Sequence, residues 1–169
     1  MSKSQFLNFL SEQYSFIENL PVDPLKLNEI IADKYKLSVV VDNKNIKKVS
    51  KQLWEYQTDT LNLIAQLKMI IDKMVSEASF NDFEKSFKYL IHLINEVIKG
   101  HEITEQEVKD YVAKMQINVK NETIDQVFKV YLKNKDALKE SFKKNVFLRI
   151  FLKNLESLVG EINDSNNNN

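Results

Sequence analysis

The chain has 169 residues, of which 43% are hydrophobic and 28% are charged, a composition typical of a single folded globular domain. It contains no cysteine, which excludes disulfides, thiol nucleophiles, iron–sulfur clusters and thiolate zinc sites. Only two glycines and two prolines are present, too few for the turns of a sandwich or barrel and for glycine-rich phosphate loops. We therefore expect an all-helical bundle of about six or seven helices.

In the first half of the chain, apolar residues recur every three or four residues, which is the period of an amphipathic helix. This spacing predicts helices over about residues 4–18, 24–35 and 45–77, and Asp23 is placed to cap the start of the second one. The valine-rich residues 37–41 favour a strand, but a lone strand has no partner. We expect them to form a buried extended linker or to continue the second helix.

The second half of the chain continues the helical spacing. A fourth helix is expected to end just before Gly100, because glycine suits the left-handed residue that often follows a helix. Thr104 begins a capping-box pattern that predicts a fifth helix. Residues 124–131 predict a short sixth helix, and Asp136 is placed to cap a seventh.

These helices predict a single domain over residues 1–162, followed by a disordered, asparagine-rich tail at residues 163–169. No run of 18 apolar residues is present, and the N-terminal residues are too polar for a signal peptide, so we expect a cytoplasmic protein without a transmembrane segment. Lysine plus arginine equals aspartate plus glutamate at 24 each, and Arg149 is the only arginine. Nucleic-acid binding is therefore not expected.

The sequence offers little for catalysis. Its two histidines, His92 and His101, stand nine residues apart without carboxylates at ligand spacing, and no serine lies in a nucleophile elbow. The acidic residues near the start of the fifth helix are explained by the helix dipole. We therefore expect a protein that is not an enzyme and that has no metal site and no cofactor.

Charged residues give two open readings. The lysine clusters form solvated faces, or they form a basic rim that meets acidic phospholipid headgroups or an acidic partner. Arg149 lies within the most apolar run, residues 146–152, where its side chain reaches water or a carboxylate, or captures a ligand anion at a cavity mouth. The two clusters are Lys44, Lys47, Lys48 and Lys51, and Lys133, Lys135, Lys139, Lys143 and Lys144.

Bulky phenylalanines are concentrated in the later helices. They fill a solid core, or they surround an apolar ligand held between helices. These residues are Phe83, Phe87, Phe142, Phe147 and Phe151.

Several short strings occur in an order similar to that of a known family. They are Val39-Val40-Val41-Asp42, Leu53-Trp54, Thr123-Ile124-Asp125-Gln126-Val127-Phe128 and Leu148-Arg149. In this order the chain resembles the tumour necrosis factor-alpha-induced protein 8 family, although that family's Lys-Ser-His-Gly motif is absent. The resemblance implies a helical fold around a deep apolar cavity, phosphoinositide binding, and a regulatory role in cell death or lipid signalling.

Two hypotheses follow. In the first, a non-enzymatic helical bundle binds a phosphoinositide-like lipid in an apolar cavity between helices. Its expected ligand-binding residues are Arg149, Lys139, Lys143, Phe142 and Phe151, with a tunnel opening near Arg149 and the lysines of the last two helices. In the second, the core is solid and the surface serves as an adaptor for a protein partner.

Overall fold

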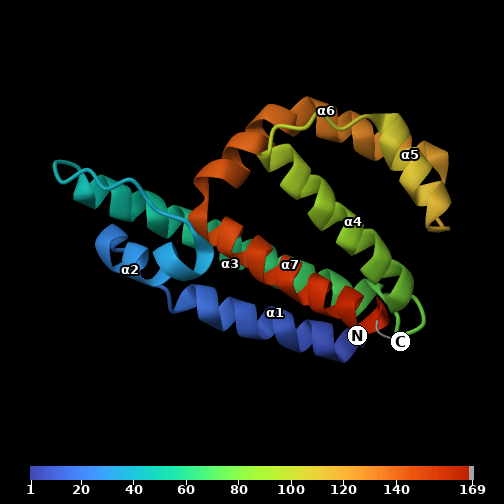
Figure 1. The fold of residues 1–169 in the computed structure, drawn as a ribbon, viewed down its shortest axis with the longest axis horizontal. Coiled ribbons are helices and arrows are strands. Elements are labelled where there is room, and N and C mark those ends of the chain that lie inside the picture. The colour runs from blue at the N-terminus through green and yellow to red at the C-terminus, as the bar shows by residue number, and fades with distance from the viewer. Residues whose placement is uncertain (168–169) are drawn as a thin grey trace. The chain divides into compact units, whose positions relative to one another are not determined.

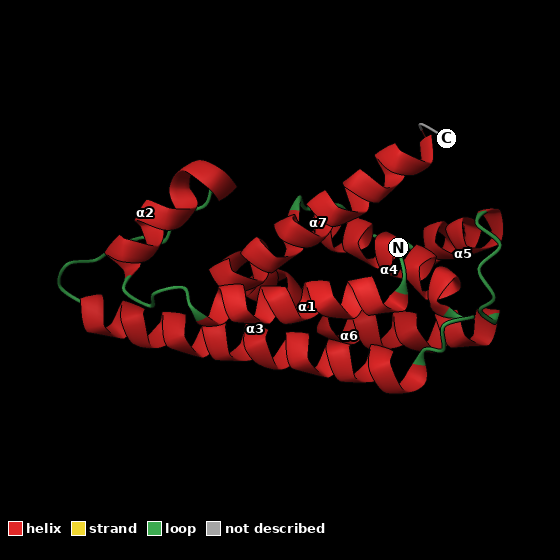
Figure 2. Cartoon of the chain, turned by 90° about the horizontal axis from the view of Figure 1, so that it is seen from below, coloured by secondary structure: helices red, strands yellow, loops and turns green. Residues whose placement is uncertain are grey.

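The computed structural model describes the backbone of residues 1–167 and the side chains of residues 1–158. This described part contains seven helices and no strand, so the predicted all-helical fold is confirmed (Figure 2). Of the predicted disordered tail, residues 163–169, the backbone is described as far as Asn167, where α7 ends, and residues 168–169 lie outside the described residues. The helices are α1 (Lys3–Glu18), α2 (Pro24–Tyr35), α3 (Ile46–Met74), α4 (Phe80–Ile98), α5 (Glu105–Lys114), α6 (Asn121–Lys144) and α7 (Val146–Asn167).

The chain forms two compact units, whose helices can be followed by colour in Figure 1. The first unit comprises Met1–Glu77 and Lys144–Asn169, and it holds α1, α2, α3 and α7. The second unit is Ala78–Lys143, and it holds α4, α5 and α6. Compact units can belong to one folding domain, so the single domain over residues 1–162 stays a prediction.

In the first unit, α3 packs against α1, α2 and α7, and α1 also contacts α7. The buried side chains come from one stripe of each helix, as the apolar spacing predicts. Asp23 caps α2 as expected, because its carboxylate accepts hydrogen bonds from the backbone N–H groups of Leu25 and Lys26, each at 3.0 Å. Core side chains without solvent exposure include Leu10, Ile17, Leu27, Ile31, Ile64, Ile71, Phe147 and Ile150.

A buried glutamine joins α3 to the end of α1. The side-chain nitrogen Nε2 of Gln57 donates to the carbonyl oxygens of Ile17 at 2.9 Å and Leu20 at 3.0 Å. The last carbonyls of a helix have no partner within the helix itself. The backbone N–H of Leu20 donates to Ile17 at 3.2 Å, and Gln57 adds a second donor inside the core, where polar groups need hydrogen-bond partners.

The boundary between α6 and α7 differs from the prediction. The sequence predicted a short helix over residues 124–131 and a cap at Asp136, but α6 continues through Asp136 to Lys144. The cap lies at Asn145 instead, whose Oδ1 accepts from the N–H of Leu148 at 3.0 Å. Asp136 is exposed in the middle of a helix, whereas Asn145 is buried and hydrogen-bonded.

The valine-rich segment 37–41 is extended and does not continue α2. Lys36 ends α2 with a φ of 54° in the left-handed region. The side chain of Asn28 then holds the segment, donating to the carbonyl of Val39 at 2.9 Å and accepting from its N–H at 2.8 Å. Leu37 is buried but Val40 is 87% exposed, so the linker is extended as one reading predicted and only partly buried.

Candidate functional site

The second unit contains an apolar pocket between α4, α5 and α6. Its volume is about 330 Å³, and all but two of its lining residues are aliphatic or phenylalanine. A pocket of this size lies within the range, about 300–1,000 Å³, that small-molecule ligands occupy. The lining residues are Leu90, Leu93, Ile94, Val97, Ile103, Val108, Val119, Thr123, Ile124, Val127, Phe128, Tyr131, Leu138 and Phe142.

Helical periodicity places these side chains around the pocket. On α4 the lining positions recur every three or four residues from Leu90 to Val97, which keeps them on one face. On α6 the same spacing extends from Thr123 to Phe142, so one long face of α6 forms the opposite wall. The α4–α5 loop contributes Ile103 and α5 contributes Val108.

The pocket has a buried floor and an open mouth. Ile103 and Ile124 are almost fully buried and lie at its base. Leu90 on α4 and Val127 on α6 are 48% and 63% exposed, although both are large apolar side chains that line the pocket. Apolar side chains left exposed together mark surfaces that bind something else.

A short turn positions the loop that carries Ile103. Gly100 has a φ of +94°, and its N–H donates to the carbonyl of Val97 at 3.0 Å while the N–H of His101 donates to Glu96 at 2.9 Å. This pair of hydrogen bonds is the Schellman arrangement that ends many helices, so the predicted role of Gly100 is confirmed. The chain is thereby turned from α4 towards α5.

Aromatic stacking holds α5 to α4. The rings of Tyr89 and Tyr111 are parallel within 7° and their centroids are 3.6 Å apart. Burial, followed by the charge of Glu107, raises the pKa of the Tyr89 phenol, so the phenol is uncharged at neutral pH. Thr104 caps α5 as predicted, accepting from the N–H of Glu107 at 3.2 Å.

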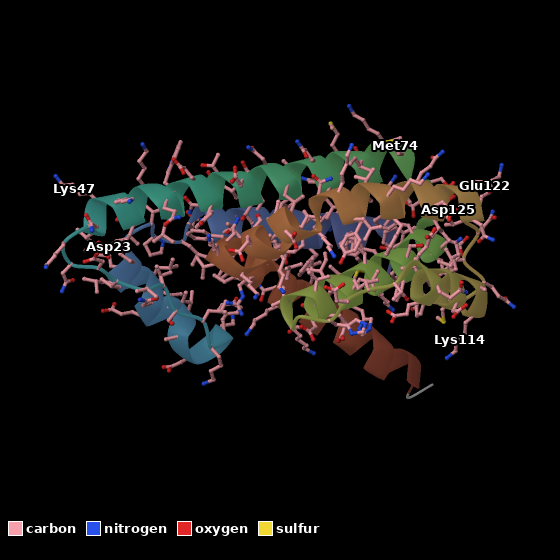
Figure 3. The ribbon with its side chains drawn as sticks, turned by 90° about the horizontal axis from the view of Figure 1, so that it is seen from above. Asp23, Lys47, Met74, Lys114, Glu122 and Asp125 are labelled. Atoms are coloured by element: carbon pink, nitrogen blue, oxygen red, sulfur yellow. The ribbon has the colours of Figure 1, made fainter. Side chains whose placement is uncertain are left out.

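An ion pair holds α5 to α6. The ammonium group of Lys109 lies 2.8 Å from a carboxylate oxygen of Asp125 and 3.5 Å from one of Glu105. The side-chain hydrogen bond with Asp125 raises the pKa of Lys109. Hydrogen bonds with Glu105 and then with Lys109 lower the pKa of Asp125, which Figure 3 labels on α6. The walls of the pocket are therefore tied together on both sides of α5.

Two lining residues carry a polar atom. Burial raises the pKa of the Tyr131 phenol, which therefore stays protonated at neutral pH and keeps an O–H that can donate to a ligand. Thr123 adds a second hydroxyl at the wall. The pocket thus offers an extensive apolar surface with only two groups that can orient a polar atom.

The five residues predicted to bind a ligand are divided between the two units. Phe142 lines the pocket, and Lys139 and Lys143 each follow a lining residue on α6. Arg149 and Phe151 belong to α7 in the first unit and are not among the lining residues. Phe151 is buried in the core of the first unit, which agrees with the hypothesis that this phenylalanine fills a solid core.

Arg149 is half-buried on α7. Its backbone N–H donates to the carbonyl of Asn145 at 3.1 Å. Its guanidinium group makes no hydrogen bond or ion pair with any residue in the range 1–158 whose side chain is described. No carboxylate partner is therefore found for Arg149 among those residues, and Arg149 does not line the pocket between α4, α5 and α6.

Sequence reasoning missed most of the pocket. The stripe of residues 124–131 was recognised as apolar, but such a stripe is equally typical of a closed core. Ile103 and Val119 lie in segments between helices, where apolar side chains carry no periodic signal. These side chains line a pocket because of the spacing of α4, α5 and α6, and no local sequence pattern determines that spacing.

No protein-family model, curated protein or solved structure matches this chain. The resemblance to the tumour necrosis factor-alpha-induced protein 8 family therefore stays a prediction. Among the described helices, none has the length and hydropathy that crossing a bilayer requires. Within the described residues, no group of three or more histidine and carboxylate side chains is arranged to hold a metal ion. In its described part the chain is thus an all-helical protein with an open apolar pocket.

Proposed function

We propose that the second unit binds one lipid-like ligand, whose apolar chain occupies the pocket between α4, α5 and α6. The observation that carries the proposal is the lining, which is carbon apart from two hydroxyl groups. Each methylene group that leaves water for such a site contributes about 0.8 kcal/mol to binding. The proposal is for binding and not catalysis, because the sequence has no cysteine and only two histidines.

Two lysines that follow lining residues on α6 favour an anionic head group. Lys139 and Lys143 stand four residues apart on α6, each next to a residue that lines the pocket. Neither forms an ion pair with any residue whose side chain is described. Long lysine side chains lay their methylenes along apolar surface and hold the ammonium group in water, where it can meet a carboxylate or phosphate.

The proposal is tested by native mass spectrometry of the purified protein, together with titration of a fluorescent fatty acid. We expect a co-purifying mass in the range of a lipid, or one fatty acid bound per chain after titration. Protein that carries no added mass and binds neither fatty acid nor a soluble short-chain phosphoinositide would contradict the proposal. We expect unlabelled fatty acid to displace the fluorescent fatty acid, because both would occupy the same pocket.

The kind of lipid is a further part of the proposal. The family resemblance favours a phosphoinositide, whose phosphates would lie near Lys139 and Lys143. Competition between a long-chain fatty acid and a short-chain phosphoinositide for the same probe separates the two head groups. A cytoplasmic location and a role in cell death or lipid signalling remain predictions.

A second candidate function is a protein adaptor that receives an amphipathic helix in the same open groove. The exposure of Leu90 and Val127 favours it, because a helix could cover both side chains. In that case the partner helix would cover the mouth of the pocket, and the affinity for fatty acids would not depend on their chain length. Affinity capture that yields no reproducible partner would count against this reading.

A further inference from the structure

In the first unit, the segment of residues 36–54 is strongly basic. It contains five lysines and one carboxylate, Asp42, in a protein whose positive and negative residues balance at 24 each. All five lysines are exposed. The lysines are Lys36, Lys44, Lys47, Lys48 and Lys51. We call this segment the basic tip.

The first turns of α3 align part of this charge with an aromatic ring. Lys47, Lys51 and Trp54 are spaced by four and three residues, so they share one stripe of the helix. Leu53 and Gln57 on the same helix are buried and face the core. Figure 3 shows Lys47 at the start of α3 with its side chain directed away from the helix.

Two large apolar side chains are exposed within the basic tip. Trp54 is 57% exposed on α3, and Val40 is 87% exposed on the extended segment before it. The indole N–H of Trp54 has no hydrogen-bond partner among the residues with described side chains. Tryptophan is favoured at membrane–water interfaces because its ring is apolar and its N–H is polar.

The single carboxylate in the basic tip, that of Asp42, accepts hydrogen bonds within a turn before α3. Asp42 accepts from the N–H of Lys44 at 3.0 Å and from the side-chain amide of Asn45 at 2.9 Å. The same two hydrogen bonds, that of Asn45 first, lower the pKa of Asp42. Asp42 therefore shapes the entry into α3 and forms no ion pair with a described lysine.

We propose that the basic tip docks on an anionic lipid bilayer, with its lysines at the headgroups and Trp54 and Val40 at the boundary with the acyl chains. Several lysines beside exposed apolar side chains form the combination that binds anionic membrane surfaces. A nucleic acid would be neutralised by the lysines but would leave Val40 without an apolar partner. An anionic bilayer offers negative headgroups to the lysines and an apolar region to Trp54 and Val40.

The tryptophan makes the test direct, because Trp54 is the only tryptophan in the chain. Full-length protein is mixed with vesicles of phosphatidylcholine alone or with phosphatidylserine added. We expect co-sedimentation with the anionic vesicles only, a shift of tryptophan emission to shorter wavelength, and quenching by brominated lipid. Unchanged emission on bound vesicles, or equal binding to neutral vesicles, would overturn the proposal.

Two double variants separate the basic tip from general lysine content. Lys47→Gln with Lys51→Gln should weaken partitioning onto anionic vesicles by about 30-fold, since each lysine near such a surface contributes roughly a fivefold effect. Lys129→Gln with Lys133→Gln removes two exposed lysines with the same spacing from α6, and we expect less than a twofold change. Equal losses in both variants would overturn the proposal.

Membrane docking is independent of the proposed ligand pocket, which lies in the second unit. Val127→Asp, a variant of the pocket mouth, should leave vesicle binding unchanged. Lys47→Gln with Lys51→Gln should leave fatty acid binding unchanged. Tight binding of a single-stranded RNA oligonucleotide without any vesicle binding would overturn the bilayer as the partner.

Discussion

The side-chain amide of Asn145, at the start of α7, donates to the hydroxyl of Thr60 on α3 across 3.0 Å, and both side chains are buried. The Thr60 hydroxyl in turn donates to the carbonyl of Tyr56 at 2.8 Å. The other amide atom, Oδ1, caps α7. This small buried network fixes where α7 begins relative to α3 within the first unit.

Asn145→Ala should lower the free energy of unfolding by about 2–3 kcal/mol, because it removes a helix cap and leaves buried polar groups unpaired. Thr60→Val should cost about 1 kcal/mol, because the Asn145 amide keeps its second acceptor, the Tyr56 carbonyl at 3.2 Å. Urea denaturation followed by circular dichroism measures both values. Asn134→Ala, on exposed α6, is the control, with an expected change within about 0.5 kcal/mol.

Gln57→Leu should destabilise the first unit by about 1–3 kcal/mol, because the carbonyls of Ile17 and Leu20 would lose the donor that Gln57 provides in the core. Gln66→Leu makes the same change at an exposed position of α3 and should be nearly neutral. Thermal unfolding of the two variants provides the comparison. Equal midpoints would mean that the hydrogen bonds to Ile17 and Leu20 contribute nothing to stability.

Val127→Asp should weaken ligand binding by at least about tenfold, since it places a carboxylate at the mouth of the apolar pocket. Val130→Asp is a closely matched control: Val130 is also on α6 and 62% exposed, but it does not line the pocket. Displacement of a fluorescent fatty acid measures both. Similar losses at the two valines would place the ligand elsewhere.

Lys139→Gln combined with Lys143→Gln should weaken binding of a fatty acid by about three- to tenfold, the effect of removing two exposed ionic contacts. Binding of the fatty alcohol of equal chain length should not change, because it carries no charge. Titration of both ligands against the variant and the unaltered protein gives the comparison. A loss of alcohol binding would indicate damage to the pocket rather than to the head-group site.

The ion pair between Lys109 and Asp125 makes the attachment of α5 to α6 sensitive to acid. The pKa of Asp125 is held below its ordinary value of 3.8. Its contribution is therefore complete above that value and is lost as the pH falls through the lower pKa of the folded state. Hydrogen-exchange protection of α5 should fall over that window.

At neutral pH, Asp125→Asn should show the same loss of protection in α5. Asp136→Asn, at an exposed position of α6, should not. If α5 keeps its protection in both variants, the ion pair of Lys109 with Asp125 does not hold this helix in place.

Local chemistry explains what could be predicted from the sequence. Asp23, Gly100 and Thr104 end or begin helices through hydrogen bonds with residues two to five positions away, so short strings contain the whole signal. Asn145 was missed because the helical spacing of apolar residues continues across it, from Leu138 and Phe142 to Val146. Its role depends on Thr60, which lies 85 residues earlier in the chain.

The candidate site was predicted less well for a related reason. Phe142 and Phe151 look alike in sequence, since each is a phenylalanine on an amphipathic helix. The structure places Phe142 in the pocket lining and Phe151 in a closed core. Whether helices meet tightly or leave a pocket depends on their spacing, which residue type and periodicity do not determine.

The dependence of affinity on chain length tests the proposed pocket most directly. Saturated fatty acids of increasing length should displace a fluorescent probe from the full-length protein with dissociation constants that fall about fourfold per added methylene. The gain should stop when the pocket is full, and Val127→Asp should reduce it while Val130→Asp does not. Dissociation constants that do not depend on chain length, or the absence of any displacement, would contradict an apolar ligand between α4, α5 and α6.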